Sequence, residues 1–224
     1  MSETTISVLT GGDDGYQASN GTVATTSTSA NCNASQPYIG MIFRSIPAEP
    51  GDTILPSFVN VYCISSANDT PNLTVRGERA PANLAATNNN LSARTKTAEG
   101  VVWNQNLASS GAQYHATPNI AAVIQEIVDA PGWVAGGDIG IFFIDNGGGG
   151  LLRISMRDSG ATQEPELHLA WETPSGGEEL TYAWPDDYWP DAYWAEYWPD
   201  YGTNTPPSTI IPQVMHHLRQ QGIS

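Results

Sequence analysis

Positive charge is scarce in this sequence of 224 residues: eight Lys and Arg stand against 23 Asp and Glu, for a formal net charge of −15. Phosphate backbones and anionic membrane surfaces repel such a chain, so we expect neither nucleic acid nor a membrane as a partner. No apolar run reaches the roughly 18 residues of a membrane-spanning helix. Residues 1–5 also lack the basic and apolar regions of a signal peptide. We therefore expect synthesis in a cytoplasm, followed by retention there or release by lysis.

Cysteine is equally scarce, since only Cys32 and Cys63 occur. A disulfide requires that the fold bring the two Cα atoms within about 7 Å and that the compartment be oxidising. We expect two reduced, half-buried thiols rather than a bridge.

Recognisable catalytic motifs are missing from the sequence as well. There is no Gly-x-Ser-x-Gly nucleophile elbow, phosphate-binding loop or dinucleotide fingerprint, and the four His are scattered. Acidic pairs such as Glu164 and Glu166 occur, but spacing alone does not separate a glycosidase pair from a solvated turn. We expect no enzyme and no cofactor.

Several residues with oxygen donors lie in loops or at the ends of expected strands, and they could hold a calcium ion. Calcium binds carboxylate and carbonyl oxygens, although no ordered spacing like that of an EF-hand loop occurs here. The candidate ligands are Asp13, Asp14, Asp138, Asp145 and Asn146.

Residues 117–144 contain the clearest pattern, a helix followed by a buried strand. Thr117 is placed to cap the helix, Pro118 suits its first turn, and residues 131–132 (Pro-Gly) end it. An apolar stripe at helical spacing consists of Ile120, Val123, Ile124, Ile127 and Val128. The apolar run at 138–144 is typical of a buried strand. Since the stripe cannot be buried by one helix alone, strands must supply the opposing layer.

Short β-rich segments surround this unit. Residues 11–15 are expected to form a turn, 17–36 an exposed strand and a long loop, and 81–90 a loop. Strands are predicted at 4–10, 38–44, 53–65, 72–77, 97–103, 152–157 and 166–172. Residues 1–172 are therefore predicted to be an all-β domain, a jelly-roll-like two-sheet sandwich with one inserted helix. Trp103 and Trp133 are expected in its core.

The composition changes after residue 172. Residues 173–181 read as a flexible linker, 182–204 as an acidic aromatic repeat, and 205–224 as a docking peptide. Trp-Pro-Asp begins at 184, 189 and 198, and the prolines exclude a continuous helix, so we predict an extended, turn-rich tail. Exposed aromatic rings favour docking onto another chain, through Trp184, Tyr188, Trp189, Tyr193, Trp194, Tyr197, Trp198 and Tyr201. Two alternatives are that the repeat covers its own sandwich or stacks on sugar rings.

Several short motifs resemble the DNRLRE-type jelly-roll module of bacterial surface proteins and phage structural proteins. They are VRGERA at 75–80, LSART at 91–95, VVW at 101–103, IQEIV at 124–128, PGW at 131–133 and EPEL at 164–167. The resemblance implies a β-sandwich that serves as an adhesive or carbohydrate-binding-like part of a larger assembly, and it does not imply an enzyme. The tail is similar to Tyr-Trp-Pro-Asp repeats at the ends of structural proteins of tailed bacteriophages.

Together these resemblances predict a non-enzymatic structural protein of a tailed-phage virion. A capsid decoration or cement protein, displayed outside and anchored by its tail to other virion proteins, is the narrower expectation. A tail or fibre component is an alternative. A carbohydrate-binding adhesion module that recognises a host-surface glycan is another. Because weak contacts gain from multivalency, we expect a homo-oligomer on the particle, with three-fold symmetry.

Overall fold

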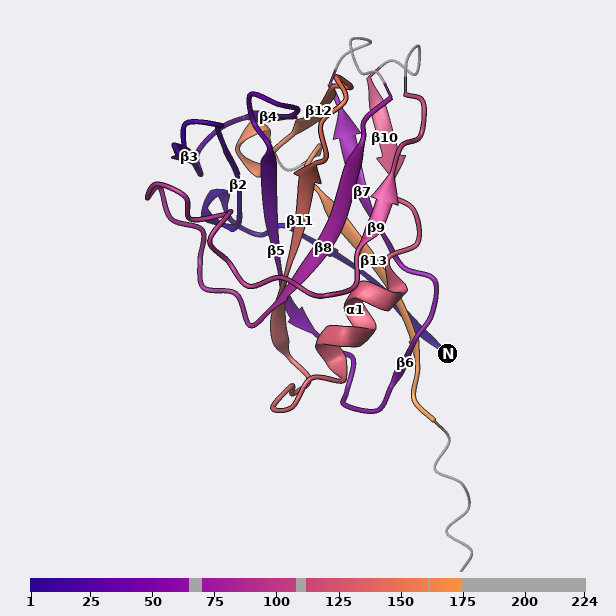
Figure 1. Ribbon diagram of the computed structural model, residues 1–224. Helices are drawn as coiled ribbons and strands as arrows, with labels where there is room; N and C mark the ends of the chain where they lie inside the picture. Colours follow the sequence, from indigo (N-terminus) through magenta and orange to yellow (C-terminus); the bar gives the residue numbers. More distant parts are fainter. Residues whose placement is uncertain (65–69, 108–111, 161, 175–224) are drawn as a thin grey trace, which may run out of the picture. The chain divides into compact units, whose positions relative to one another are not determined.

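The computed structural model describes residues 1–64, 70–107, 112–160 and 162–174 (Figure 1). Within these residues the chain forms two antiparallel sheets and one α-helix. The predicted all-β, jelly-roll-like sandwich with one inserted helix is confirmed. The expected tail lies, from residue 175 onward, outside the described residues.

The larger sheet has seven strands in the order β1-β13-β7-β12-β4, with β10 paired to β7 and β6 paired to β13. Ser2 lies opposite Trp171, so the first and last strands of the sandwich are neighbours. The strands are β1 (Ser2–Ser7), β4 (Ser29–Cys32), β6 (Thr53–Ile54), β7 (Phe58–Cys63), β10 (Gln113–Ala116), β12 (Leu152–Ser155) and β13 (Glu166–Glu172).

The smaller sheet has six strands in the order β3-β2-β5-β11-β8-β9. Its strands are β2 (Asp14–Gln17), β3 (Val23–Ala24), β5 (Tyr38–Ile46), β8 (Leu73–Arg79), β9 (Val101–Trp103) and β11 (Gly137–Asp145). Strand β11 pairs with β5 on one side and β8 on the other, so that Ile141 lies opposite both Met41 and Gly77. It is the strand that the apolar run at 138–144 predicts.

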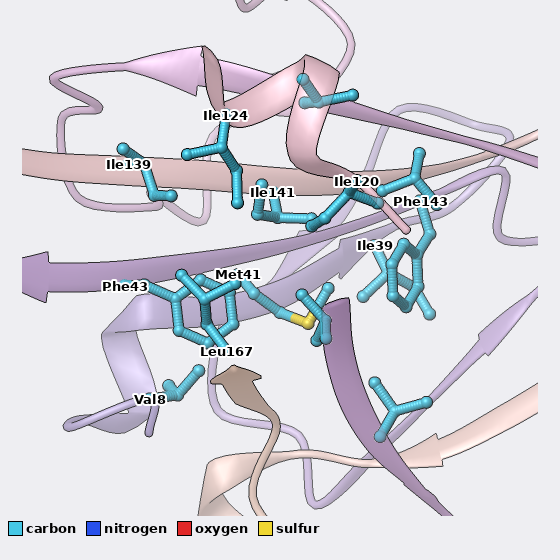
Figure 2. Close-up of a cluster of buried hydrophobic side chains, with 14 of the residues drawn as sticks. Val8, Ile39, Met41, Phe43, Ile120, Ile124, Ile139, Ile141, Phe143 and Leu167 are labelled. Carbon is cyan, nitrogen blue, oxygen red and sulfur yellow. The ribbon is translucent and has the colours of Figure 1, made fainter. Parts of the chain in front are cut away.

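The core lies between the two sheets. Alternate side chains of β11 point into it, because successive residues of a strand face opposite sides. Ile139, Ile141 and Phe143 are fully buried there, and Trp103 packs edge-on against Phe143 with ring centroids 5.5 Å apart. Figure 2 shows this cluster, which also contains Val8, Ile39, Met41, Phe43, Ile120, Ile124 and Leu167.

Helix α1 (Ala121–Val128) closes one part of this core. All five residues of its predicted stripe are buried, so the helical pattern is confirmed. The predicted start is wrong, because the helix begins four residues after Thr117. The Thr117 hydroxyl accepts a hydrogen bond from the Val59 amide (3.0 Å) and does not cap the helix. The side-chain oxygen of Asn119 instead accepts from the amides of Ala121 and Ser57, at 3.0 Å each.

Several predicted strand bounds are also wrong. The single strand expected at 53–65 is two strands, because Pro56 has no amide to pair and the Ser57 amide is taken by Asn119. The strand expected at 97–103 is only β9, since the Thr97 hydroxyl bonds the Gly77 amide (2.9 Å). The turn expected at 11–15 contains the 3-10 helix η1 (Gly11–Asp13), and a second, η2 (Arg157–Ser159), follows β12.

A long segment covers the outer face of the six-stranded sheet. Within residues 81–98, Leu84 and Leu91 pack on Phe142 of β11 and form a second buried cluster with Val23 and Ile42. Three cations hold the segment in place. Arg94 pairs with Glu78 (2.9 Å), Arg76 donates to the Ala98 carbonyl (2.7 Å), and the Lys96 ammonium lies 5.1 Å from the Phe142 ring centre.

Both cysteines are unbridged and fully buried, so the expectation of free thiols is confirmed and that of half-burial is wrong. Cys32 pairs with Leu152 and Cys63 with Ile154, on opposite edges of β12. Two strand spacings, about 9.6 Å, separate the strands that carry them, which is too far for a disulfide. Burial raises the pKa of both thiols, that of Cys63 to about 12.

The burial of the helix stripe yields a first prediction. Ile124→Asp places a carboxylate in the core, and its desolvation should lower the free energy of unfolding by several kcal/mol. Ala122→Asp is the matched control, because Ala122 is exposed on the same helix. Denaturant unfolding of both variants tests this, and an unchanged midpoint for Ile124→Asp would contradict the packing.

The thiols yield a second prediction. A thiol reagent should titrate no cysteine in the native protein, because both sulfur atoms are buried and their pKa values are raised. In denaturant, without prior reduction, the same reagent should titrate two. A titre of zero in denaturant would indicate a disulfide.

Candidate functional site

The seven-stranded sheet carries a polar and aromatic outer face, in contrast to the covered face of the other sheet. On β7, Val59 and Val61 point into the core, whereas Phe58, Asn60 and Tyr62 point outward and are half-buried. We call this surface the open face. Its residues, from β1, β13, β7 and β10, are Glu3, Thr5, Phe58, Asn60, Tyr62, Tyr114, Ala116, Glu166, His168 and Ala170.

One end of the open face is built around His168. Phe58 lies opposite His168 in register, and their rings stack with centroids 4.8 Å apart and planes 18° from parallel. Thr5 lies 3.2 Å from Nδ1 of the imidazole, and the Asn60 amide lies 3.0 Å from Nε2. Both ring nitrogens therefore have polar partners, which fix the orientation of the ring.

The other end contains two tyrosines. Tyr62 and Tyr114 are paired across β7 and β10, with ring centroids 5.3 Å apart in an edge-on arrangement. The Tyr114 hydroxyl, which has one proton to donate, lies within hydrogen-bonding distance of the carbonyls of Thr162 (3.2 Å) and Glu164 (3.3 Å) in the segment before β13. Burial and the nearby carboxylates of Glu166 and Glu164 raise the pKa of Tyr114 to about 12.

Asn60 and Glu166 lie opposite each other in the row between the two ring pairs. The Glu166 carboxylate is 3.6 Å from Nε2 of His168 and about a third exposed. A shallow hollow of about 400 Å³ adjoins the Phe58 end, lined by Thr5, Pro56, Phe58 and His168 among others.

Electrostatically, the open face is neutral to acidic. Its ten residues include two carboxylates and no Lys or Arg. Arg153 of β12 lies beyond the Tyr62 end of the face, because its neighbour Ile154 is opposite Cys63, the last residue of β7. The arrangement offers aromatic rings and oriented hydrogen-bonding groups, which suit binding.

The calcium candidates do not form one site, which corrects that expectation. Asp13 and Asp138 both form ion pairs with Arg44, the latter at 2.7 Å. Asp145 lies at the far end of β11 from Asp138, seven residues or about 23 Å away. Asn146 accepts a hydrogen bond from Thr74 (3.0 Å). Among the described residues, no group of three His, Cys, Asp or Glu is arranged to hold a metal.

Asp14 is a buried carboxyl at the start of β2. Desolvation raises its pKa to about 7, against the lowering effect of a hydrogen bond from the Arg157 amide (2.7 Å). The neighbouring carboxylates of Asp158 and Asp13 raise it further. Asp14 is only 1 % exposed, so a change in the protonation of its carboxyl near pH 7 takes place inside the fold.

The remaining predicted residues divide into two groups. Trp103 and Trp133 are buried, as predicted for core residues, and the Trp133 indole donates to the Ala48 carbonyl (3.0 Å). The eight aromatic residues predicted for docking, Trp184 to Tyr201, lie outside the described residues. The open face was missed from the sequence, although Phe58, Asn60 and Tyr62 alternate with apolar residues inside a predicted strand.

No protein-family model matches the chain, and neither does any curated protein. The resemblance to the DNRLRE-type module thus remains a prediction. In the part of the chain that the structure describes, no helix combines the length and apolarity needed to cross a membrane.

The burial of Asp14 yields a third prediction. A folded-state pKa of about 7, above the ordinary value of 3.8 for Asp, means that the native protein keeps up to about pH 7 a proton that the unfolded chain releases at lower pH. This contribution to stability is complete below pH 4 and is lost as the pH rises through 7. Relative to Asp14→Asn, which mimics the neutral form, the wild-type protein should lose stability between pH 5 and pH 8.

Denaturant unfolding of the two proteins at both pH values measures this difference. Glu172→Gln is the control, since Glu172 is exposed at the end of β13. A wild-type–Asp14→Asn difference that does not change with pH would show that Asp14 is ionised throughout.

Proposed function

We propose that this chain is a non-enzymatic structural component of a tailed-bacteriophage particle. In the narrower form of the proposal it decorates the outside of the capsid, and the segment after residue 173 attaches it. A place on the tail or a fibre is the alternative location. The observation that carries the proposal is the Trp-Pro-Asp repeat, with four Trp and five Tyr between residues 182 and 201.

The composition of the sandwich supports a separate role for this repeat. Among the described residues, the main core cluster runs from Val8 to Leu169, and all of its buried members are exposed by 7 % or less. Aromatic residues dominate the energetics of protein interfaces, and truncation of a central Trp typically costs about 2 kcal/mol or more. A repeat rich in Trp is thus suited to docking.

The position of the chain end is consistent with attachment. Strand β13 is held between β1 and β7 and pairs at its end with β6, so Glu172 lies opposite Thr53. The chain consequently leaves the sandwich from a fixed point. A partner bound by the following residues would hold the sandwich from this end of β13.

The fourth prediction concerns a truncated chain of residues 1–173. It should remain soluble and melt within a few degrees of the full chain, because the described residues 8–169 already form a cluster of buried apolar side chains. It should not bind particles purified from a lysate of the host, which the full chain should bind. Melting curves and co-sedimentation with the particles measure the two properties on the same samples.

Single substitutions refine this test. Trp184→Ala, Trp189→Ala, Trp194→Ala and Trp198→Ala should weaken attachment unequally, because a few anchors carry most of the affinity of an interface. Val134→Ala, an exposed change on the sandwich, is the control and should leave attachment unchanged. A truncated chain that melts early yet still binds particles would assign the repeat to the sandwich instead.

A further inference from the structure

We propose that Asn146 is a self-modification site, which deamidates by reaction with the Gly147 amide at a rate set by contacts from the start of β8. The Asn-Gly pair opens the turn between β11 and β12, and the only other such pair in the sequence is at 20–21. The reaction is intramolecular and consumes only water, so no partner has to reach the site. This chemistry belongs to the sandwich and is independent of the attachment proposed above.

The reaction requires an asparagine that is followed by a residue with an unhindered nitrogen. The Gly147 nitrogen attacks Cγ of Asn146, and a new N–Cγ bond closes a cyclic imide. The Cγ–Nδ2 bond breaks, and the proton of the attacking nitrogen passes through water to the ammonia that leaves. Water then opens the imide at either carbonyl, which gives aspartate or isoaspartate. Glycine favours the first step, because it has no Cβ to block close approach.

The two Asn-Gly pairs differ in the freedom of the attacking nitrogen. Gly21 is buried, and its amide donates to the Ala18 carbonyl (2.9 Å). Around Gly147, an added Cβ would meet no neighbouring atom, and within the described part of the chain its amide donates to no carbonyl. Asn146 itself is exposed. In the native protein we therefore expect reaction at Asn146 and protection of Asn20.

Two residues at the start of β8 hold Asn146, and we call Asn72 and Thr74 the clamp. The side-chain oxygen of Asn146 accepts from the Thr74 hydroxyl (3.0 Å), and its Nδ2 lies 3.4 Å from Oδ1 of Asn72. The main-chain amide of Asn146 donates to the Asn72 carbonyl (2.9 Å). Nδ2 of Asn72 donates in turn to the Gly147 carbonyl (2.8 Å). Both ends of the reacting amide and the main chain on either side of it are thus fixed.

The clamp slows the reaction without preventing it. To bring Cγ onto the Gly147 nitrogen, the side chain of Asn146 has to turn away from its partners in the clamp. These hydrogen bonds join exposed groups at the end of a strand, where local opening requires little free energy. The native rate at Asn146 is therefore lower than in the unfolded chain and higher than that of the buried Gly21 pair.

Either product changes the turn. Aspartate and isoaspartate both add a carboxylate next to Asp145, the last residue of β11. Isoaspartate also routes the main chain through the former side chain, which lengthens it by one atom and shifts the Gly147 carbonyl away from Asn72. The modification therefore releases the β11–β12 turn from the start of β8, in a fraction of molecules that grows with the age of the protein.

The test incubates the full chain in mildly alkaline buffer, with and without denaturant, and follows both positions by peptide mapping and mass spectrometry. In the native protein, aspartate and isoaspartate should accumulate at position 146 while Asn20 stays intact. In denaturant both positions should react. Position 146 should then react at least threefold faster than in the native protein, because the clamp is lost.

Three variants isolate the contributions of the clamp and of the amide. Thr74→Val keeps the β-branched shape but removes the hydroxyl, and it should raise the native rate at position 146 at least threefold. Thr53→Val, the same change at an exposed position of β6, is the matched control and should leave that rate unchanged. Asn146→Gln keeps an amide but would have to close a larger ring, so it should give no product at this position over the same period.

Three results would overturn the proposal. The first is a native protein that keeps Asn146 intact while the denatured chain reacts at both positions. The second is an equal native rate at positions 20 and 146. The third is a rate in Thr74→Val that is unchanged or lower. The comparison of native and denatured wild-type protein needs no variant, so it decides the matter if Thr74→Val fails to fold. Particle attachment is measured separately, so a failure here leaves the proposed function standing.

Discussion

The sandwich depends on burying β11 from both sides. Ile139, Ile141 and Phe143 face the core, whereas Phe142 faces outward from the same strand and is fully buried as well. A strand in this position needs a second cover, which residues 81–98 supply. The ion pair of Arg94 with Glu78 holds that cover against the sheet. Within the described residues, the six-stranded sheet is thus covered on both faces, whereas the outer face of the seven-stranded sheet carries the half-buried Phe58, Asn60 and Tyr62.

The sequence predicts the parts of this fold whose pattern is local. The stripe of α1 and the run of β11 are apolar at helical or continuous spacing, and both lie where predicted. Element bounds depend on partners distant in the chain. Thr117 looks like a cap until its hydroxyl is seen to accept from Val59, 58 residues away. Strand β10 has no apolar pattern that would predict it from the sequence. Its pairing with one edge of β7 is what makes it a strand.

The candidate site divides in the same way. The alternation of Phe58, Asn60 and Tyr62 is visible in the sequence, but the register that brings His168 opposite Phe58 is not. Likewise, nothing local to Asp13 or Asp138 indicates that Arg44 lies between them. Carboxylates that appear free in the sequence are therefore neutralised within the fold. The partners of Arg44 are especially hard to assign, since Asp13 and Asp138 lie 31 and 94 residues away in the chain.

The pairing of Ser2 with Trp171 places the first and last residues of the sandwich side by side. Both chain ends of the sandwich lie at one end of the seven-stranded sheet, whereas the glycine turn at 147–149 lies near Leu152, past the Cys63 end of β7. A Cβ added at Gly147 or Gly149 would meet no neighbouring atom. A protein held through its C-terminal segment would therefore crowd anything fused to Met1. An epitope inserted in the glycine turn would instead lie at the opposite end of the seven-stranded sheet from Ser2 and Glu172.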